Sequence, residues 1–153
     1  MDTSTSSGGT LDIHMAILEP DHPKLPQSDL AKAFCEAGCR KVYLDEEPGI
    51  VHLVSEDPVV SADLSIDTEV FIVGSDDPPE GVGLVVGLDA GMIRTLRSAA
   101  GRWEMAATFY NGSLLGIAPV PSGGSHHLMG LYADEKEAAE TAAKFTRVVP
   151  KAL

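Results

Sequence analysis

The dipeptide Asn111-Gly112 joins two apolar segments, Trp103-Glu-Met-Ala-Ala-Thr-Phe-Tyr110 and Ser113-Leu-Leu-Gly-Ile-Ala-Pro-Val120. Asparagine and glycine readily adopt the positive φ angles that a two-residue hairpin turn requires, which makes this dipeptide a strong hairpin signal. The sequence therefore predicts two antiparallel strands at 103–110 and 113–120. A sheet of this kind needs a second layer to cover one of its faces.

Further strands are predicted on the two sides of this hairpin. Short runs rich in apolar and β-branched residues, bounded by turn-forming residues, occur at 11–18, 41–44, 50–54, 59–64, 70–73, 82–88 and 126–133. Because most neighbouring strands are separated by short polar turns, antiparallel pairing is favoured. Three strands have a central glycine, which predicts that a helix packs closely on the sheet at Gly83, Gly116 and Gly130.

Three segments have the apolar periodicity of an amphipathic helix. Each follows a residue suited to the N-cap position, which gives predicted helices at 29–37 after Ser28, at 90–100 after Asp89 and at 135–149 after Asp134. Phe34 and Phe145 lie on the apolar stripes of the first and third helices, so we expect both to be buried. Arg94 and Arg97 lie away from the apolar stripe of the second.

We therefore predict an α+β fold, a two-layer sandwich in which three helices cover a mainly antiparallel sheet of about six to eight strands. The 153 residues fit one domain. The polar residues 1–9 predict a disordered N-terminal tail, and residues 10–153 are expected to form a single α+β domain.

The order of these elements resembles that of the small acidic chaperones of bacterial type III secretion. The final strand and helix, at 126–149, also resemble the end of the profilin and roadblock sandwiches. These are resemblances of topology alone, and no functional residue is carried over from any of these families.

The acidic character of the chain is confined to one stretch. Between Val42 and Ile93 there are 12 acids and no Lys or Arg, whereas the rest of the chain has 11 acids and 11 bases, and the net charge is −12. Such a block attracts cationic partners and repels nucleic acid and anionic lipid. The alternative interpretation is that acids in surface turns only keep the protein in solution.

Six of these acids occupy two predicted turns, and we expect them to cluster on one exposed side: Asp45, Glu46, Glu47, Asp76, Asp77 and Glu80. The leading hypothesis is a non-enzymatic binding module of the escort-chaperone, immunity-protein or inhibitor type. It would engage a basic protein through this surface or through a sheet face, and a homodimer is left open. The topological resemblance implies a profilin-like or roadblock-like interaction domain as an alternative. Without a signal sequence or an apolar run long enough to span a bilayer, we expect a cytoplasmic protein without a membrane partner.

No nucleophile, phosphate-binding or metal motif is recognised, so we predict no catalytic residue, no metal and no cofactor. The two cysteines, Cys35 and Cys39, are expected to be free and mostly buried thiols.

The histidines are the basis of a second hypothesis for the function. The five histidines are interpreted mainly as surface residues: His14, His22, His52, His126 and His127. His126 and His127 are neighbours on a predicted strand, so they are expected on opposite faces. The competing hypothesis is a small enzyme or small-molecule-binding domain whose pocket lies near His52, Trp103, Tyr110 and His126.

Overall fold

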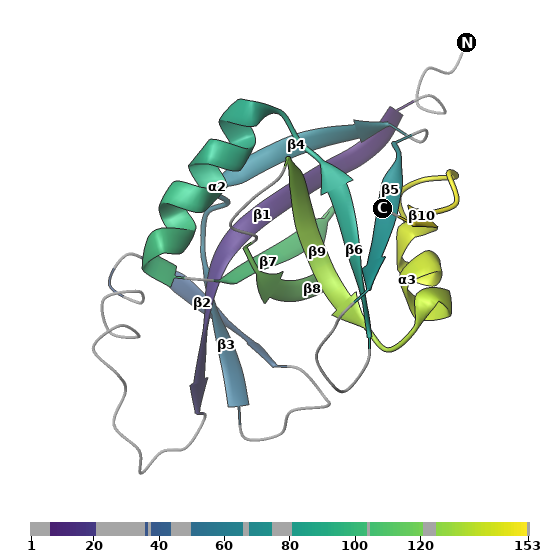
Figure 1. Cartoon of the computed structure of the whole chain (residues 1–153). Helices are drawn as coiled ribbons and strands as arrows, with labels where there is room; N and C mark the ends of the chain where they lie inside the picture. The colour runs from purple at the N-terminus through teal and green to yellow at the C-terminus, as the bar shows by residue number, and fades with distance from the viewer. Residues whose placement is uncertain are drawn as a thin grey trace.

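The fold is mixed α+β, and its strands form two separate sheets (Figure 1). The computed structural model describes residues 7–20, 36, 38–43, 50–65, 68–74, 81–103, 105–120 and 125–152. All strand pairs but one are antiparallel, as predicted. The single predicted sheet of six to eight strands is wrong, because six strands belong to one sheet and four to the other.

The six-stranded sheet is organised around its first strand. Its members are β1 (Ser7–Pro20), β2 (Cys39–Tyr43), β3 (Ile50–Ser55), β4 (Val60–Ser65), β7 (Met105–Tyr110) and β8 (Ser113–Pro119). On one edge, β1 pairs with β4 in its first half and with β3 in its second half, while β7 pairs along the other edge. Ile13, for example, lies between Val60 and Thr108. β1 therefore pairs with strands from both the first and the second half of the chain.

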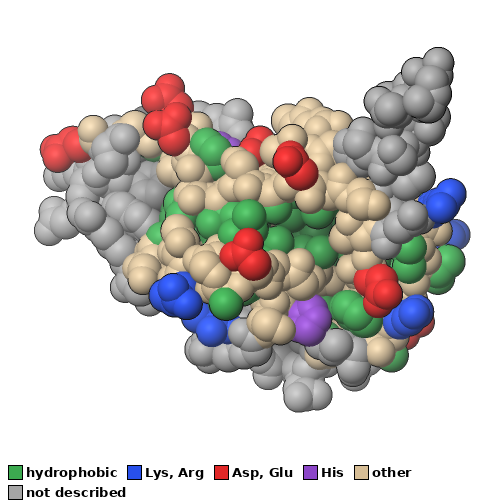
Figure 2. Space-filling view, turned by 90° about the horizontal axis from the view of Figure 1, so that it is seen from above, with side chains coloured by type: hydrophobic (Ala, Val, Ile, Leu, Met, Phe, Trp, Pro, Cys, Tyr) green, Lys and Arg blue, Asp and Glu red, His purple; other side chains and the backbone are tan. Residues whose placement is uncertain are grey.

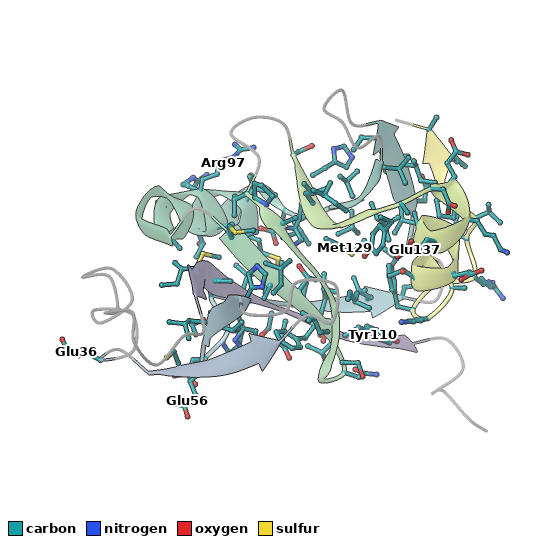
Figure 3. All side chains as sticks on the ribbon, turned by 90° about the horizontal axis from the view of Figure 1, so that it is seen from below. Glu36, Glu56, Arg97, Tyr110, Met129 and Glu137 are labelled. Carbon is teal, nitrogen blue, oxygen red and sulfur yellow. The ribbon has the colours of Figure 1, made fainter. Side chains whose placement is uncertain are left out.

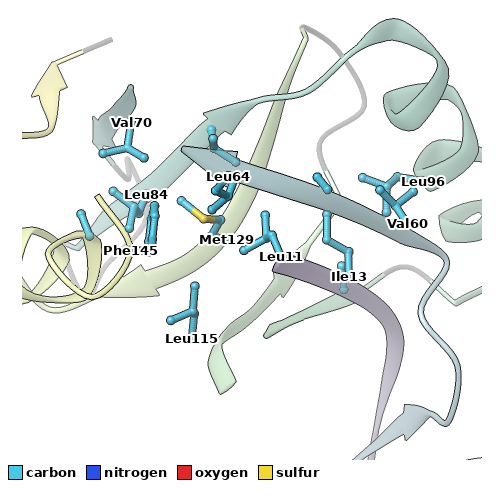
Figure 4. Packing of buried hydrophobic residues seen from close by; sticks show 14 of the residues in the cluster. Leu11, Ile13, Val60, Leu64, Val70, Leu84, Leu96, Leu115, Met129 and Phe145 are labelled. Atoms are coloured by element: carbon cyan, nitrogen blue, oxygen red, sulfur yellow. The ribbon is translucent and has the colours of Figure 1, made fainter. Parts of the chain in front are cut away.

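The four-stranded sheet consists of β5 (Val70–Gly74), β6 (Val82–Gly87), β9 (His126–Tyr132) and β10 (Lys151–Ala152), in the order β10-β5-β6-β9. The short β10, which was not predicted, runs parallel to β5. The core lies between the two sheets, and Figure 4 shows side chains from both within it. Alternate residues of β1 enter this core, and Leu11 and Ile13 are completely buried opposite Leu84 and Met129.

Two helices add side chains to the same core, and Figure 1 places them on opposite sides of the molecule. α2 (Ala90–Trp103) packs against β1 and β4, and α3 (Glu135–Ala142) packs against β5, β6 and β9. The N-caps predicted for these two helices are confirmed, whereas the third, Ser28, lies outside the described residues. The Met92 N–H donates to Asp89 Oδ1 at 2.8 Å, and the Glu137 N–H donates to Asp134 Oδ1 at 2.8 Å.

Phe145 is 3% exposed, as predicted, although it lies outside the helix. α3 ends at Ala142 instead of at residue 149, and Val149 is 74% exposed. Beyond the helix, the Thr146 hydroxyl donates to the Thr68 carbonyl oxygen at 2.7 Å, and residues 151–152 pair with β5.

Other predicted bounds differ at the ends of elements. Residues 7–9 belong to β1 and not to the predicted tail, because Ser7 pairs with Ser65. The predicted helix at 29–37, with Phe34, lies outside the described residues except for Glu36, which is helical. Three helices were predicted, and two helical elements are present in the described part of the chain.

The predicted hairpin is confirmed, and its turn has the expected backbone. Asn111 and Gly112 have φ angles of 48° and 86°, both in the left-handed region. Beyond its role in the turn, Asn111 accepts a hydrogen bond at Oδ1 from the Thr10 N–H at 2.9 Å. The turn thus also fixes the position of β1 beside the hairpin.

The two sheets meet where β8 approaches β9, and two glycines permit this approach. A Cβ atom added to Gly116 would lie 2.9 Å from the Gly130 Cα and 2.9 Å from the Met129 carbonyl oxygen. Beside this contact, the Tyr132 hydroxyl donates to the Leu115 carbonyl oxygen at 3.1 Å. The predicted helix-on-sheet packing at these two glycines is therefore wrong, because the close approach is between strands of the two sheets.

We expect Gly116→Ala to lower the free energy of unfolding by about 1–3 kcal/mol, because the new methyl group meets backbone atoms that cannot rotate away. Gly74→Ala is the matched control, since a Cβ at Gly74 has no atom within 4 Å. Urea denaturation of both variants tests this. Equal effects of the two substitutions would contradict the tight junction.

Candidate functional site

A pocket of about 530 Å³ lies between α2 and the start of β9. Its described lining residues come from one face of α2 and from the residue before β9: Ala90, Ile93, Arg94, Arg97, Ser98 and Ser125. The Leu88 N–H donates to the Ser125 carbonyl oxygen at 3.3 Å, which holds the start of α2 near the start of β9. The volume is within the range of small-molecule sites.

A much smaller cavity adjoins the pocket. It has a volume of about 10 Å³ and is lined by Ile93, Leu96, Arg97, Val120, His126 and His127. Ile93 and Arg97 line both spaces, so the two are neighbours across these side chains. We call the larger space the outer pocket and the smaller one the inner cavity. The inner cavity has room for about one water-sized group.

The charge of the described residues that line the outer pocket is opposite to that of the whole protein. Arg94 is exposed and Arg97 is half-buried, and the described lining residues include no carboxylate. Figure 3 shows Arg97 on α2. The arginines are three residues apart, a spacing that places two side chains on neighbouring parts of one helix surface. They are also the first bases after the acidic stretch of the sequence.

His127 is the buried polar residue of the inner cavity. It is 1% exposed, and its Nε2 lies 2.8 Å from the Thr108 hydroxyl oxygen, which is itself fully buried on β7. The His127 Nδ1 has no hydrogen-bond partner. Burial lowers the pKa of His127 from 6.5 to about 4, so the imidazole is neutral at pH 7.

The expectation of surface histidines is wrong for three of the four described histidines. His14, His52 and His127 are buried, and the ring of His14 packs edge-on against Phe109 at 5.1 Å. The His14 Nδ1 donates to the Ser55 carbonyl oxygen at 2.8 Å. A carbonyl oxygen can only accept, so this contact places a proton on Nδ1. His126 is half-buried and packs against Phe71 at 5.4 Å, in contrast to His127 in the core.

The pocket predicted near His52, Trp103, Tyr110 and His126 is only partly found. His126 lines the inner cavity, whereas His52 lies on β3 and lines neither space. Tyr110 packs against Phe145 at 5.7 Å, and the side chain of Trp103 is outside the described part of the structure. The sequence prediction did not connect Arg94 and Arg97 with a pocket, although it placed both away from the apolar stripe of the helix. Their position at the end of the base-free stretch was the available signal.

The six acids predicted to bind a partner, at 45–47, 76–77 and 80, all lie outside the described residues. Five other acids of the same stretch are described and exposed: Glu56, Asp57, Asp63, Glu69 and Asp89. Figure 2 shows acidic side chains in several separate places around an apolar area on one face. Cys39 is half-buried against the main core, and Cys35 is not among the described residues.

The described residues contain no group of three or more His, Cys, Asp or Glu side chains placed to hold a metal ion. They also contain no helix with the length and apolar character needed to cross a bilayer. No protein family model, curated protein or solved structure matches the chain.

We expect the stability of the protein to fall below pH 6.5 through His127. The folded-state pKa of about 4 is below the unfolded value of 6.5, so the contribution is complete above pH 6.5 and is lost as the pH falls towards 4. The total is about 3 kcal/mol, since one pKa unit corresponds to about 1.4 kcal/mol.

Chemical denaturation between pH 7 and pH 4.5 measures this dependence. A double variant, His127→Leu with Thr108→Val, removes both partners of the buried hydrogen bond and serves as the comparison. The variant should lose less stability over this range than the original protein. An identical pH dependence in the two proteins would contradict the assignment to His127.

Proposed function

We propose that this chain is a binding protein for small organic anions and that the ligand occupies the outer pocket. The observation that carries the proposal is the set of groups lining this space. Two arginines and two serines surround a volume of about 530 Å³, with no carboxylate among the described lining residues. The proposal keeps the small-molecule-binding alternative of the sequence analysis. It places the binding pocket beside α2 instead of near His52 and Trp103.

The net negative charge of the protein explains why the position of the two arginines matters for anion binding. A chain of net charge −12 repels anions in general, so an anion reaches it only where bases produce a local positive field. The planar guanidinium group offers several N–H donors that match the oxygen atoms of a carboxylate or a phosphate. Arg94 and Arg97 both line the outer pocket, where the concave wall also reduces screening by water.

The remaining lining residues fit a compact organic ligand. The hydroxyl groups of Ser98 and Ser125 can donate to ligand oxygens, and Ala90 and Ile93 provide apolar contact for a carbon skeleton. A few polar groups on a partly apolar wall are typical of small-molecule sites. The geometry therefore supports a ligand that has an anionic group and a short carbon chain.

We expect Arg94→Gln to weaken anion binding about tenfold to a hundredfold, because hydrogen bonds to charged groups contribute roughly 1.5–3 kcal/mol. Lys136→Gln is the matched control, since it removes the same charge from α3, on the other side of the molecule. Calorimetric titration with succinate, malate, propyl phosphate and glycerol 3-phosphate provides the measurement. The proposal is wrong if none of these anions binds, or if both variants weaken binding equally.

A second function is favoured by the base-free stretch between Val42 and Ile93. Its 12 acids support binding of a cationic protein partner, as in the hypothesis of an acidic interaction module. The described acids Glu56, Asp57 and Asp63 are exposed and available to such a partner. This function is independent of the outer pocket, because none of these acids lines it.

A variant with the six turn acids changed to Asn or Gln tests this second function: Asp45, Glu46, Glu47, Asp76, Asp77 and Glu80. The original protein should capture a cationic partner from a host extract at 0.1 M salt, and the variant should capture less of it. The capture should also decline at 1 M salt, where the screening length falls to about 3 Å. Capture that depends on neither the six acids nor the salt would leave these acids with a role in solubility alone.

A further inference from the structure

The inner cavity lies beside the proposed binding site. Ile93 and Arg97 line both spaces, so a ligand held by Arg97 in the outer pocket lies next to the inner cavity. The volume of about 10 Å³ admits one water molecule or one oxygen-sized group and excludes a whole carboxylate or phosphate. The wide outer pocket thus has a second, much smaller space as its neighbour.

His127, which lines the inner cavity, has one ring nitrogen whose hydrogen-bonding capacity is unused. The His127 ring is fixed by its Nε2 contact with the Thr108 hydroxyl at 2.8 Å, while Nδ1 has no partner. If Thr108 donates to Nε2, then Nδ1 carries a proton and is a donor. If Nε2 donates to Thr108, then Nδ1 is an acceptor. In either tautomer, a buried polar atom without a partner costs free energy, which a suitable ligand group recovers.

We propose that the inner cavity binds one hydroxyl group of the anionic ligand, and that this hydroxyl forms a hydrogen bond with His127 Nδ1. The inference rests on the proposed function, because Arg94 and Arg97 must first hold the anionic group. It specifies the ligand class as a compact anion with a hydroxyl close to its charged group. Hydroxy acids and polyol phosphates are the two kinds of molecule with this chemistry.

Three properties of the cavity favour a hydroxyl over a charged oxygen. A hydroxyl can both donate and accept, so it satisfies His127 Nδ1 in either tautomer. His127 is neutral at pH 7 because burial lowers its pKa to about 4, so it offers no charge to attract an anion. The apolar walls contributed by Leu96 and Val120 would remove water from a charged group at a high free-energy cost.

Two matched pairs of probes test the inference, malate with succinate and glycerol 3-phosphate with propyl phosphate. In each pair the molecules share the anionic groups and chain length and differ in hydroxyl groups. We expect the hydroxylated member to bind the original protein about tenfold more tightly, which is the size of effect expected from one additional neutral hydrogen bond. The pair with the larger ratio distinguishes a carboxylate ligand from a phosphate ligand.

Two variants separate this inference from the proposed function. Arg94→Gln should weaken both members of a pair by the same factor and leave their ratio unchanged. His127→Leu combined with Thr108→Val should bring the ratio close to one while the non-hydroxylated member still binds. In the original protein, the ¹⁵N chemical shift of His127 Nδ1 should change with the hydroxylated probe and stay constant with its partner. This shift also tests the inference if the double variant does not fold.

Each contrary outcome has a distinct meaning. Equal affinities within both pairs, with binding still weakened by Arg94→Gln, would overturn the inner-cavity assignment and leave the proposed function in place. A preference for the hydroxylated probe that persists in the double variant would also overturn it, because the hydroxyl would then be recognised elsewhere. No binding of any of the four probes would overturn the proposed function and this inference together.

Discussion

The close contact between Gly116 and Gly130 is the constraint on which the arrangement of the two sheets depends. With hydrogen atoms in place of side chains, β8 and β9 approach closely enough for the Tyr132 hydroxyl to reach the Leu115 carbonyl oxygen. The same approach lets the buried hydroxyl of Thr108, on one sheet, meet the imidazole of His127, on the other. The Tyr132 and Thr108 hydroxyls and the His127 Nε2 therefore have partners inside an apolar core because the backbones lie so close together. The glycines allow the short distance between β8 and β9, and the hydrogen bonds form only at that distance.

The candidate site is a consequence of the same junction. His127 lines the inner cavity and is held by Thr108 through Nε2, so its other ring nitrogen remains without a partner. The helix contributes apolar residues to the core on one side and arginines to the pocket on the other. Its capping by Asp89 and the contact between Leu88 and Ser125 hold these arginines beside β9. In the function proposed here, one histidine therefore serves a structural hydrogen bond through Nε2 and the ligand through Nδ1.

Local features of the fold were predictable because they depend on neighbouring residues. The Asn111-Gly112 turn and the caps at Asp89 and Asp134 follow from short sequence patterns. The division into two sheets could not be predicted from the sequence, because the pairing of β1 with both β4 and β7 depends on contacts between distant parts of the chain. The end of α3 was misplaced for a similar reason, since Thr146 bonds to Thr68. The arginine pocket required β9 to lie beside α2, which periodicity along a helix cannot specify.

The central place of β1 has a consequence for how the chain folds during synthesis. One edge of this strand can pair with β3 and β4 soon after they leave the ribosome, but the other edge must wait for β7. The hydrogen bond from Thr10 to Asn111 connects residues 101 positions apart. Between the end of β4 and the start of β7 lie roughly 40 residues, which take roughly 2–8 seconds to translate at 5–20 residues per second. During that interval an apolar strand has an unpaired edge, the kind of surface on which nascent chains associate. Slower translation of residues 66–104 would lengthen this period of exposure and increase the demand for chaperones.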